Sequence, residues 1–148
     1  CHFASHVFLN NSSIKGIRLG ATATGFTTIN GNLKTSGFSN GPLELRKLRQ
    51  IGSSSNDLFN PASLLVNTAH LEGDFSCAGS TNITLESSIF NRNNGFSSGN
   101  ITNVSACTFS DIMGTATTFT KTGGGVNNWS GGNSFGEVVL NAWLAPGH

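Results

Sequence analysis

The sequence predicts an all-β fold, a right-handed parallel β-helix whose coils repeat about every 19 residues. Residues 82–109 carry the same pattern twice, first as NITLESSIF and then as NITNVSACTF. Eleven Phe residues can fill a core, and charged residues make up only 10% of the chain, so the composition argues against disorder. Repetition at a fixed period is the sequence signature of a solenoid.

The repeated unit is a triplet, in which an aliphatic residue is followed three positions later by a small residue and five positions later by a large apolar one. Because alternate side chains of a strand point to opposite sides, a bend within the triplet turns all three inward. Each backbone then pairs with the coils above and below, and like side chains stack into ladders. The third positions, which form the predicted core ladder, are Leu19, Phe38, Leu71, Phe90, Phe109 and Phe135.

The small positions of the triplets predict a second ladder at a corner of the coil. Ser88, Cys107 and Asn133 occupy these positions, where narrow side chains fit and can form hydrogen bonds between coils. Cys107 is therefore expected to be a buried, reduced thiol rather than a nucleophile. Six or seven coils are expected, and parallel strands joined by crossovers are almost always right-handed.

The regular spacing is interrupted at residues 41–60, where the distance between two triplets clearly exceeds one period. A Gly-Pro pair opens the segment, as at a helix start, and a Gly follows its basic residues, as at a helix end. We therefore expect a short helix or helical loop that projects from the coil. The alternative is a distorted coil with Leu48 and Ile51 turned inward. The basic residues are expected to be a solvated face, with binding of an anionic sugar or phosphate as the alternative.

The two ends of the chain differ in character. Residues 1–136 are expected to form the coils, and residues 137–148 a C-terminal capping or interface strand that begins EVVLNAWL. If this strand is a cap, Trp143 covers the open end of the coil. If it is an interface strand, it contacts another subunit. A start at Cys1 rather than Met favours a processed product, an excised fragment or the ordered part of a longer protein.

Charge and hydropathy exclude two classes of partner. The net charge of +1 gives no electrostatic argument for binding nucleic acid. The sequence has no run of about 18 apolar residues, so no membrane span is expected.

The sequence has no pattern typical of catalysis or of a resident cofactor, so we assign no catalytic, cofactor-binding or metal-binding residues. Cys1, His2 and His6 are potential zinc ligands, but no fourth ligand is evident and packing is their expected role. Carboxylate pairs arise only through folding, for example Glu72 with Asp74.

Arg92 and Asp111 both lie two residues after a ladder Phe. This spacing predicts that they stack on adjacent coils. An ion pair between them explains both residues without catalysis.

The segments NITLESSIF, NITNVSACTF and GGNSF (131–135) resemble the coil motif of right-handed parallel β-helix proteins of the pectate-lyase-like superfamily. The resemblance covers about residues 14–135 and implies a fold rather than one function. That superfamily includes polysaccharide lyases and hydrolases, phage tailspikes and fibres, and secreted adhesins. The catalytic Asp, Arg or Lys clusters of its enzymes have no positions here onto which they can be carried.

From this resemblance we expect a non-catalytic structural or receptor-binding part of an extracellular assembly, such as a phage tailspike or tail fibre, located outside the cell or on the virion surface. Open coil ends and the apolar tail predict a homo-oligomer, in the form of a trimer. Surface polysaccharide is the expected partner, contacted by Trp129 through stacking and by Arg92 and Glu86 through polar groups. The alternatives are a polysaccharide lyase or glycoside hydrolase, and a secreted adhesin.

Overall fold

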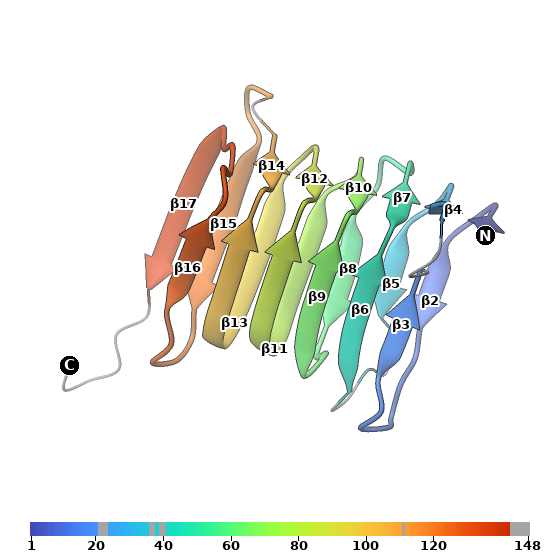
Figure 1. Cartoon of the computed structure of the whole chain (residues 1–148), viewed down its shortest axis with the longest axis horizontal. Helices are drawn as coiled ribbons and strands as arrows, with labels where there is room; N and C mark the ends of the chain where they lie inside the picture. The colour runs from blue at the N-terminus through green and yellow to red at the C-terminus, as the bar shows by residue number, and fades with distance from the viewer. Residues whose placement is uncertain (21–23, 36–37, 39–40, 111, 143–148) are drawn as a thin grey trace.

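The chain was analysed as a computed structural model that describes all residues except 21–23, 36–37, 39–40, 111 and 143–148. The described residues form a parallel β-solenoid of about five turns (Figure 1). All of their regular secondary structure is β-strand, and none of it is a helix that could cross a membrane. The prediction of an all-β parallel coil is therefore confirmed, whereas the expected six or seven coils exceed the observed number.

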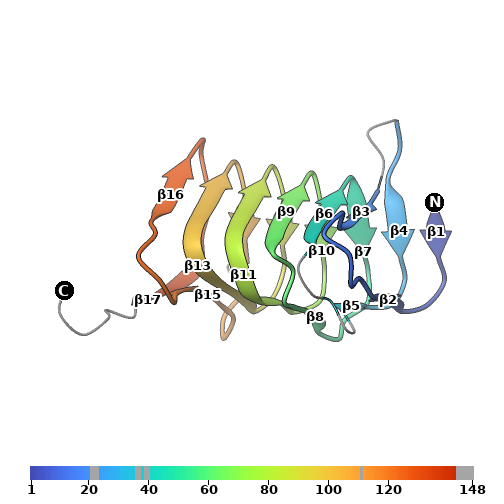
Figure 2. The same cartoon turned by 90° about the horizontal axis from the view of Figure 1, so that it is seen from below.

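Each coil contributes strands to three faces, and Figure 2 shows how β11 and β13 bend from one face to the next. Face I consists of β2 (Val7–Leu9), β5 (Leu33–Thr35), β8 (Asn56–Phe59), the first parts of β11 (Phe75–Glu86) and β13 (Asn94–Ser105), β15 (Ala116–Lys121) and β17 (Glu137–Ala142). Face II consists of β3 (Ile17–Leu19), β6 (Pro42–Arg46), β9 (Ser63–Asn67), the second parts of β11 and β13, and β16 (Asn127–Ser130). Face III consists of β1 (His2–Phe3), β4 (Thr27–Ile29), β7 (Leu48–Gln50), β10 (His70–Leu71), β12 (Ile89–Phe90) and β14 (Thr108–Phe109).

The corner between face II and face III is made the same way in four successive coils. One residue there has a positive φ, and the middle position of the triplet follows it; the positive-φ residues are Lys47, Thr68, Ser87 and Ala106. The middle position is Leu48 in the first of these coils and a small residue in the next three. The Ser88 hydroxyl accepts a hydrogen bond from the Ala69 backbone N–H at 3.0 Å, and Asn133 Oδ1 accepts one from the Cys107 N–H at 2.9 Å. The predicted corner ladder therefore exists, and its polar members bind the backbone of the preceding coil.

The downstream part of the predicted core ladder is confirmed. On face III, Leu71 aligns with Phe90 and Phe90 with Phe109, so each step equals the repeat of the sequence. The Phe90 and Phe109 rings stack with centroids 5.1 Å apart, and Phe135 stacks on Phe109 at 4.8 Å. All of these side chains are buried except Phe135, which is partly buried.

The upstream part of the predicted ladder is wrong. Leu19 aligns with Leu45 on face II, so it occupies the first position of a triplet rather than the third. Phe38 is buried in the connection between β5 and β6. The third positions of these coils are Ile29 and Gln50. The prediction failed because the steps here are longer than the downstream repeat and because a polar residue fills one apolar position.

The helix predicted over residues 41–60 is also wrong, since this segment forms β6, β7 and β8. Alternate side chains of β6 are buried, which is the period of a strand and not of a helix. The alternative of an inward-facing coil holds for Leu48, which is buried, whereas Ile51 is exposed and Gln50 turns inward in its place.

The C-terminal strand β17 pairs with β15 along its 6 residues and so extends face I. Trp143 and Asp111 lie outside the described residues. The covering role of Trp143 and the ion pair between Arg92 and Asp111 therefore remain predictions.

Candidate functional site: a groove on face I

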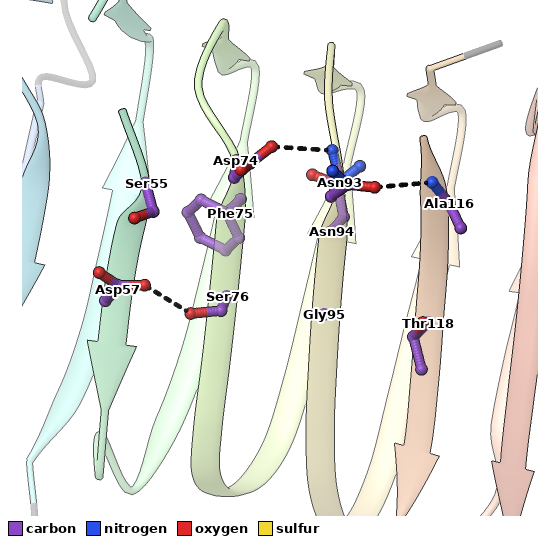
Figure 3. Close-up of a pocket in the computed structure, with 10 residues that line it drawn as sticks. All are labelled: Ser55, Asp57, Asp74, Phe75, Ser76, Asn93, Asn94, Gly95, Ala116 and Thr118. Atoms are coloured by element: carbon purple, nitrogen blue, oxygen red, sulfur yellow. Dashed lines mark hydrogen bonds between the residues drawn. The ribbon is translucent and has the colours of Figure 1, made fainter. Parts of the chain in front are cut away.

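The outer surface of face I is hollowed where β8, β11, β13 and β15 lie side by side (Figure 3). The groove has a volume of about 290 Å³. Its floor is low at Gly95, because nothing lies within 4 Å of the position that a Cβ atom would occupy there. The lining residues with polar or small side chains include Asp57, Asp74, Ser76, Asn93, Gly95 and Thr118.

Strand register explains why these side chains share one surface. Asp57 aligns with Ser76 on the next coil, Ser76 with Gly95, and Gly95 with Thr118. The alternation of a strand keeps this whole row on the outside of the coil. A second outward row contains Asp74 and Asn93, each one residue before a buried position of its strand.

The two carboxylates of the groove are held by neighbouring coils. Asp57 accepts a hydrogen bond from the Ser76 hydroxyl at 3.1 Å and lies 3.5 Å from the ammonium group of Lys34. Asp74 Oδ1 accepts from the Asn93 backbone N–H at 3.2 Å. The Asn93 side-chain oxygen in turn accepts from the Ala116 N–H at 3.0 Å. These contacts fix the acidic wall of the groove across neighbouring coils.

The two carboxylates are diagonal neighbours on adjacent strands. Asp57 lies opposite Ser76, and Asp74 precedes Ser76 by two residues. With a strand spacing of about 4.8 Å and a rise of about 3.3 Å per residue, the Cα atoms of Asp57 and Asp74 are about 8 Å apart.

Two exposed aromatic rings lie close to this wall. Phe59 follows Asp57 by two residues on β8, on the same outward side, and its side chain is 61% exposed. It aligns with Ala78 on the next coil, which has a small side chain. Phe8 is 66% exposed and begins the row that continues through Lys34 to Asp57.

The residues that the sequence assigns to glycan binding lie in three different places. Glu86 faces outward on face II, where its Oε2 accepts a hydrogen bond from the Asn67 amide at 2.6 Å. Arg92 follows β12 and lines a separate hollow at the edge of face III. Trp129 packs against Phe119 and Phe135 with centroids 5.4 and 5.1 Å apart. Its 39% exposure reflects its place in the last coil rather than on a groove.

The basic segment of β6 is partly neutralised. Glu44 accepts hydrogen bonds from Arg18 Nε at 2.6 Å and from Arg46 Nε at 3.0 Å. The hydrogen bonds from Arg18 and Arg46 hold the pKa of the Glu44 carboxyl below its usual value. These guanidinium groups therefore already have an acidic partner within the chain.

Cys107 and the N-terminal histidines have ordinary packing or hydrogen-bonding roles in the described part of the chain. Cys107 is buried, as predicted, and burial raises the pKa of its thiol. Among the described residues, no three His, Cys, Asp or Glu side chains converge on one point. His6 instead accepts a hydrogen bond through Nδ1 from the Asn32 N–H at 3.0 Å, and His2 lies 3.3 Å from the Asn30 amide.

Part of the groove can be predicted from the sequence by the same repeat that predicts the Phe ladder. Phe75 is a buried residue that aligns with Asn94, one repeat later in the chain. Applying the repeat to this position predicts that Asp74 and Asn93 point outward next to each other. Phe59 gives no such signal, because only the structure shows that its ring faces outward.

Comparison with protein-family models, with curated proteins and with solved structures returned no match. The functional argument therefore depends on the residues of the groove themselves.

Proposed function

We propose that the chain is a non-catalytic, glycan-binding β-solenoid from an extracellular assembly such as a phage tailspike or tail fibre, and that it binds surface polysaccharide in the groove of face I. The observation that carries the proposal is the combination of an acidic wall, a floor of small residues and an exposed ring at Phe59.

The chemistry of a sugar matches these three parts. Sugar hydroxyls donate hydrogen bonds to carboxylates such as Asp57 and Asp74, and they accept from amides and hydroxyls such as those of Asn93 and Ser76. The C–H side of a pyranose ring packs on an aromatic ring such as that of Phe59. A shallow, open groove suits a chain that passes through it, since neither end needs to be enclosed.

The repeat of the solenoid also suits a polymer. Successive coils are about 4.8 Å apart, which is close to the length of one pyranose unit. A glycan that runs along the axis therefore meets equivalent positions on β8, β11, β13 and β15 in turn. The acidic wall favours neutral or amino sugars over uronic acids, because a carboxylate on the sugar would be repelled by Asp74, whereas the charge of Asp57 is partly offset by Lys34.

Binding of oligosaccharides from bacterial surface polysaccharides, measured by calorimetry, tests the proposal. We expect Asp74→Asn and Phe59→Ala each to weaken binding at least about tenfold, a change of about 1.4 kcal/mol. Gly95→Val should also weaken binding, because its side chain fills the floor. Glu86→Gln is the matched control on face II and should leave the affinity unchanged. Equal affinity in wild type and all groove variants would exclude this groove as the site.

The alternative function, a glycoside hydrolase, is favoured by one observation. Asp57 and Asp74 form a pair of outward carboxylates on adjacent coils, and paired carboxylates on either side of a glycosidic bond are the machinery of most such enzymes. A reducing-end assay separates the two functions. Cleavage that is lost in both Asp57→Asn and Asp74→Asn would establish the hydrolase, whereas binding without cleavage supports the binding function.

The assembly is proposed to be a homotrimer. Support comes from the exposed apolar side chains of the last coils, which include Ile112, Met113, Val126, Val139 and Leu140. Packing of three chains side by side would cover part of this surface. Sedimentation at micromolar concentration tests the claim, and a stable monomer would contradict it.

A further inference from the structure

A second group of polar side chains converges on face III, away from the groove. His70 lies on β10, and Glu72 follows it by two residues on the same side. Asn91 lies opposite Glu72 on the next coil, because His70 aligns with Ile89. All three side chains are partly exposed. We call this group the His70–Glu72–Asn91 triad.

Three distances define the triad. His70 Nε2 lies 2.9 Å from Glu72 Oε1, and Asn91 Nδ2 lies 3.0 Å from His70 Nε2. Asn91 Nδ2 also donates to Glu72 Oε2 at 2.9 Å. The imidazole nitrogen, the carboxylate and the amide therefore approach one another at nearly equal separations.

Hydrogen bonding uses only two of the three contacts. A protonated Nε2 donates to Glu72 Oε1 while Asn91 donates to Glu72 Oε2, so the two donor nitrogens lie 3.0 Å apart with no bond between them. An unprotonated Nε2 accepts from Asn91, but it then lies 2.9 Å from Glu72 Oε1 with no proton between them. A cation that accepts lone pairs from all three side chains would use every contact.

We propose that the triad is a binding site for a divalent transition-metal ion such as Zn²⁺, Co²⁺ or Ni²⁺. Ligand bonds of about 2.1 Å place neighbouring ligand atoms about 3.4 Å apart at the tetrahedral angle that Zn²⁺ prefers, and about 3.0 Å apart at the right angles of an octahedral site. The separations in the triad are 2.9 to 3.0 Å, so an octahedral ion fits without movement and a tetrahedral one after the side chains separate by a few tenths of an ångström. Unprotonated His70 Nε2, the two Glu72 oxygens and the Asn91 carbonyl oxygen, after the amide turns over, then all direct lone pairs at the ion, with Oε1 beside His70 and Oε2 beside Asn91. Imidazole with oxygen ligands suits this class of metals.

The surroundings leave room for further ligands. Glu72 and Asn91 line a hollow of about 330 Å³ together with Arg92, Thr108 and Ser110. Water or an anion in this hollow can complete the coordination shell. Arg49 aligns with His70 on the preceding coil. The positive charges of Arg49 and Arg92 weaken the binding of a cation and favour an anionic co-ligand.

The chain contains a matched comparison for this site. His2 and Asn30 have the same relation as His70 and Asn91, with His2 aligned to Thr28 and its Nε2 lying 3.3 Å from the Asn30 amide. The position that Glu72 fills beside His70 is occupied beside His2 by Ala4, which has no carboxylate. The His2–Asn30 pair is therefore not expected to bind a metal ion.

Titration of ZnCl₂ into chelator-treated protein by calorimetry tests the proposal, with the absorption spectrum of the Co²⁺ form as a second readout. All variants carry Cys1→Ser, which removes an exposed thiol that would bind the same ions. We expect one saturable site, which His70→Ala and Glu72→Gln each weaken at least about tenfold. His2→Ala and Asp74→Asn should leave the affinity unchanged, so the result is independent of glycan binding.

Asn91→Asp gives the sharpest discrimination. In a metal site, a second carboxylate tightens Zn²⁺ binding, and we expect a gain of about tenfold in affinity. In a triad held by hydrogen bonds alone, the same change only places two negative charges together and lowers the melting temperature, whether or not Zn²⁺ is present. Weaker Zn²⁺ binding by Asn91→Asp, or affinity unchanged by His70→Ala, would overturn the proposal.

Discussion

In the coils from β10 to β17 phenylalanine rings form most of the aromatic core, beside aliphatic side chains and the buried amide of Asn94. In the coils from β4 to β9 the side chains at the positions equivalent to Phe90 and Phe75 are the buried amides of Gln50 and Asn56. The aromatic half contains neighbouring rings whose centroids are 4.8 to 6.2 Å apart, from Phe75, Phe90, Phe96, Phe109, Phe119 and Phe135. The amide half is joined by hydrogen bonds of Gln50 and Asn56.

Gln50 connects three successive coils. Its Nε2 donates to the carbonyl oxygens of Gly31 at 2.9 Å and Gly52 at 2.6 Å, and its Oε1 accepts from the Gly73 N–H at 3.1 Å. Oε1 also accepts from the Asn56 amide at 3.0 Å. All four hydrogen-bonding positions of this buried amide are therefore used, which removes the cost of burying it.

The comparison shows that one backbone path tolerates two kinds of interior. Stacked rings stabilise the coil through buried area and dispersion, which depend little on direction. The amide pair stabilises it through directed bonds that fix the spacing of particular coils. The two halves should therefore respond differently to substitution.

The largest expected effect is in the aromatic half. Phe109→Ala should lower the free energy of unfolding by about 3 to 5 kcal/mol, because it removes a buried ring and leaves a cavity. Phe109 is 1% exposed and stacks between Phe90 and Phe135. Denaturant unfolding measures the change, and Phe8→Ala is the exposed control. A loss below about 1 kcal/mol would mean that this register is wrong.

The next largest effect is in the amide half. Gln50→Leu should cost about 2 to 4 kcal/mol, because it removes the acceptor of the buried Gly73 N–H and of one Asn56 amide N–H. A Leu at the equivalent position of the next coil, Leu71, is fully buried and packs well. If Gln50→Leu were neutral, the two halves would differ only in composition and not in the kind of interaction that stabilises them.

The same difference explains which parts of the fold the sequence predicts. In the aromatic half Leu71, Phe90 and Phe109 follow one another at the third triplet position by 19 residues each, and Phe135 follows after 26, so the pattern is visible and correct. In the amide half the polar Gln50 is expected on the surface. The steps between equivalent residues of successive coils are also longer, so the predicted register is shifted. That shift misplaced Leu19 and Phe38. The extra residues between triplets, with Gly-Pro at one end and Gly at the other, led to the expectation of a helix where β6, β7 and β8 lie.

The candidate sites are harder to predict than the fold, because they depend on residues from separate coils. Asp57, Asp74 and Phe59 come together only through the register of β8 and β11. Asn91 reaches Glu72 in the same way. A repeat indicates which side chains point outward, but their diagonal contacts require the correct register for every coil.

Cys77 lies at the boundary of the two halves, aligned with Leu58 on one side and Phe96 on the other. Burial raises the pKa of its thiol to about 11 from an ordinary value of 9.0. Between these pH values the unfolded chain has lost a proton that the folded chain retains, so stability falls as the pH rises. The full stabilisation is present below pH 9 and should decrease by about 2 to 3 kcal/mol by pH 11.

Comparison with Cys77→Ala isolates this effect. The variant should lose less stability than wild type between pH 9 and pH 11, when unfolding is measured across this range. Lys121 has the opposite effect in both proteins. Burial lowers the pKa of its ammonium group, so its contribution increases the free energy of unfolding as the pH rises. Parallel pH curves for the two proteins would show that the thiol is accessible to solvent.

The smallest expected effects are at two glycines, one in each half. A Cβ atom at Gly52 would meet the Gly31 carbonyl oxygen at 2.6 Å, so Gly52→Ala should cost about 1 to 3 kcal/mol through overpacking. At Gly95 a Cβ atom meets nothing within 4 Å, and φ is not in the left-handed region. Gly95→Ala should therefore change stability by no more than about 1 kcal/mol, in the stabilising direction, because Ala loses less backbone entropy on folding. Thermal unfolding of the two variants side by side tests the contrast, and a destabilised Gly95→Ala would mean that the groove floor is already filled.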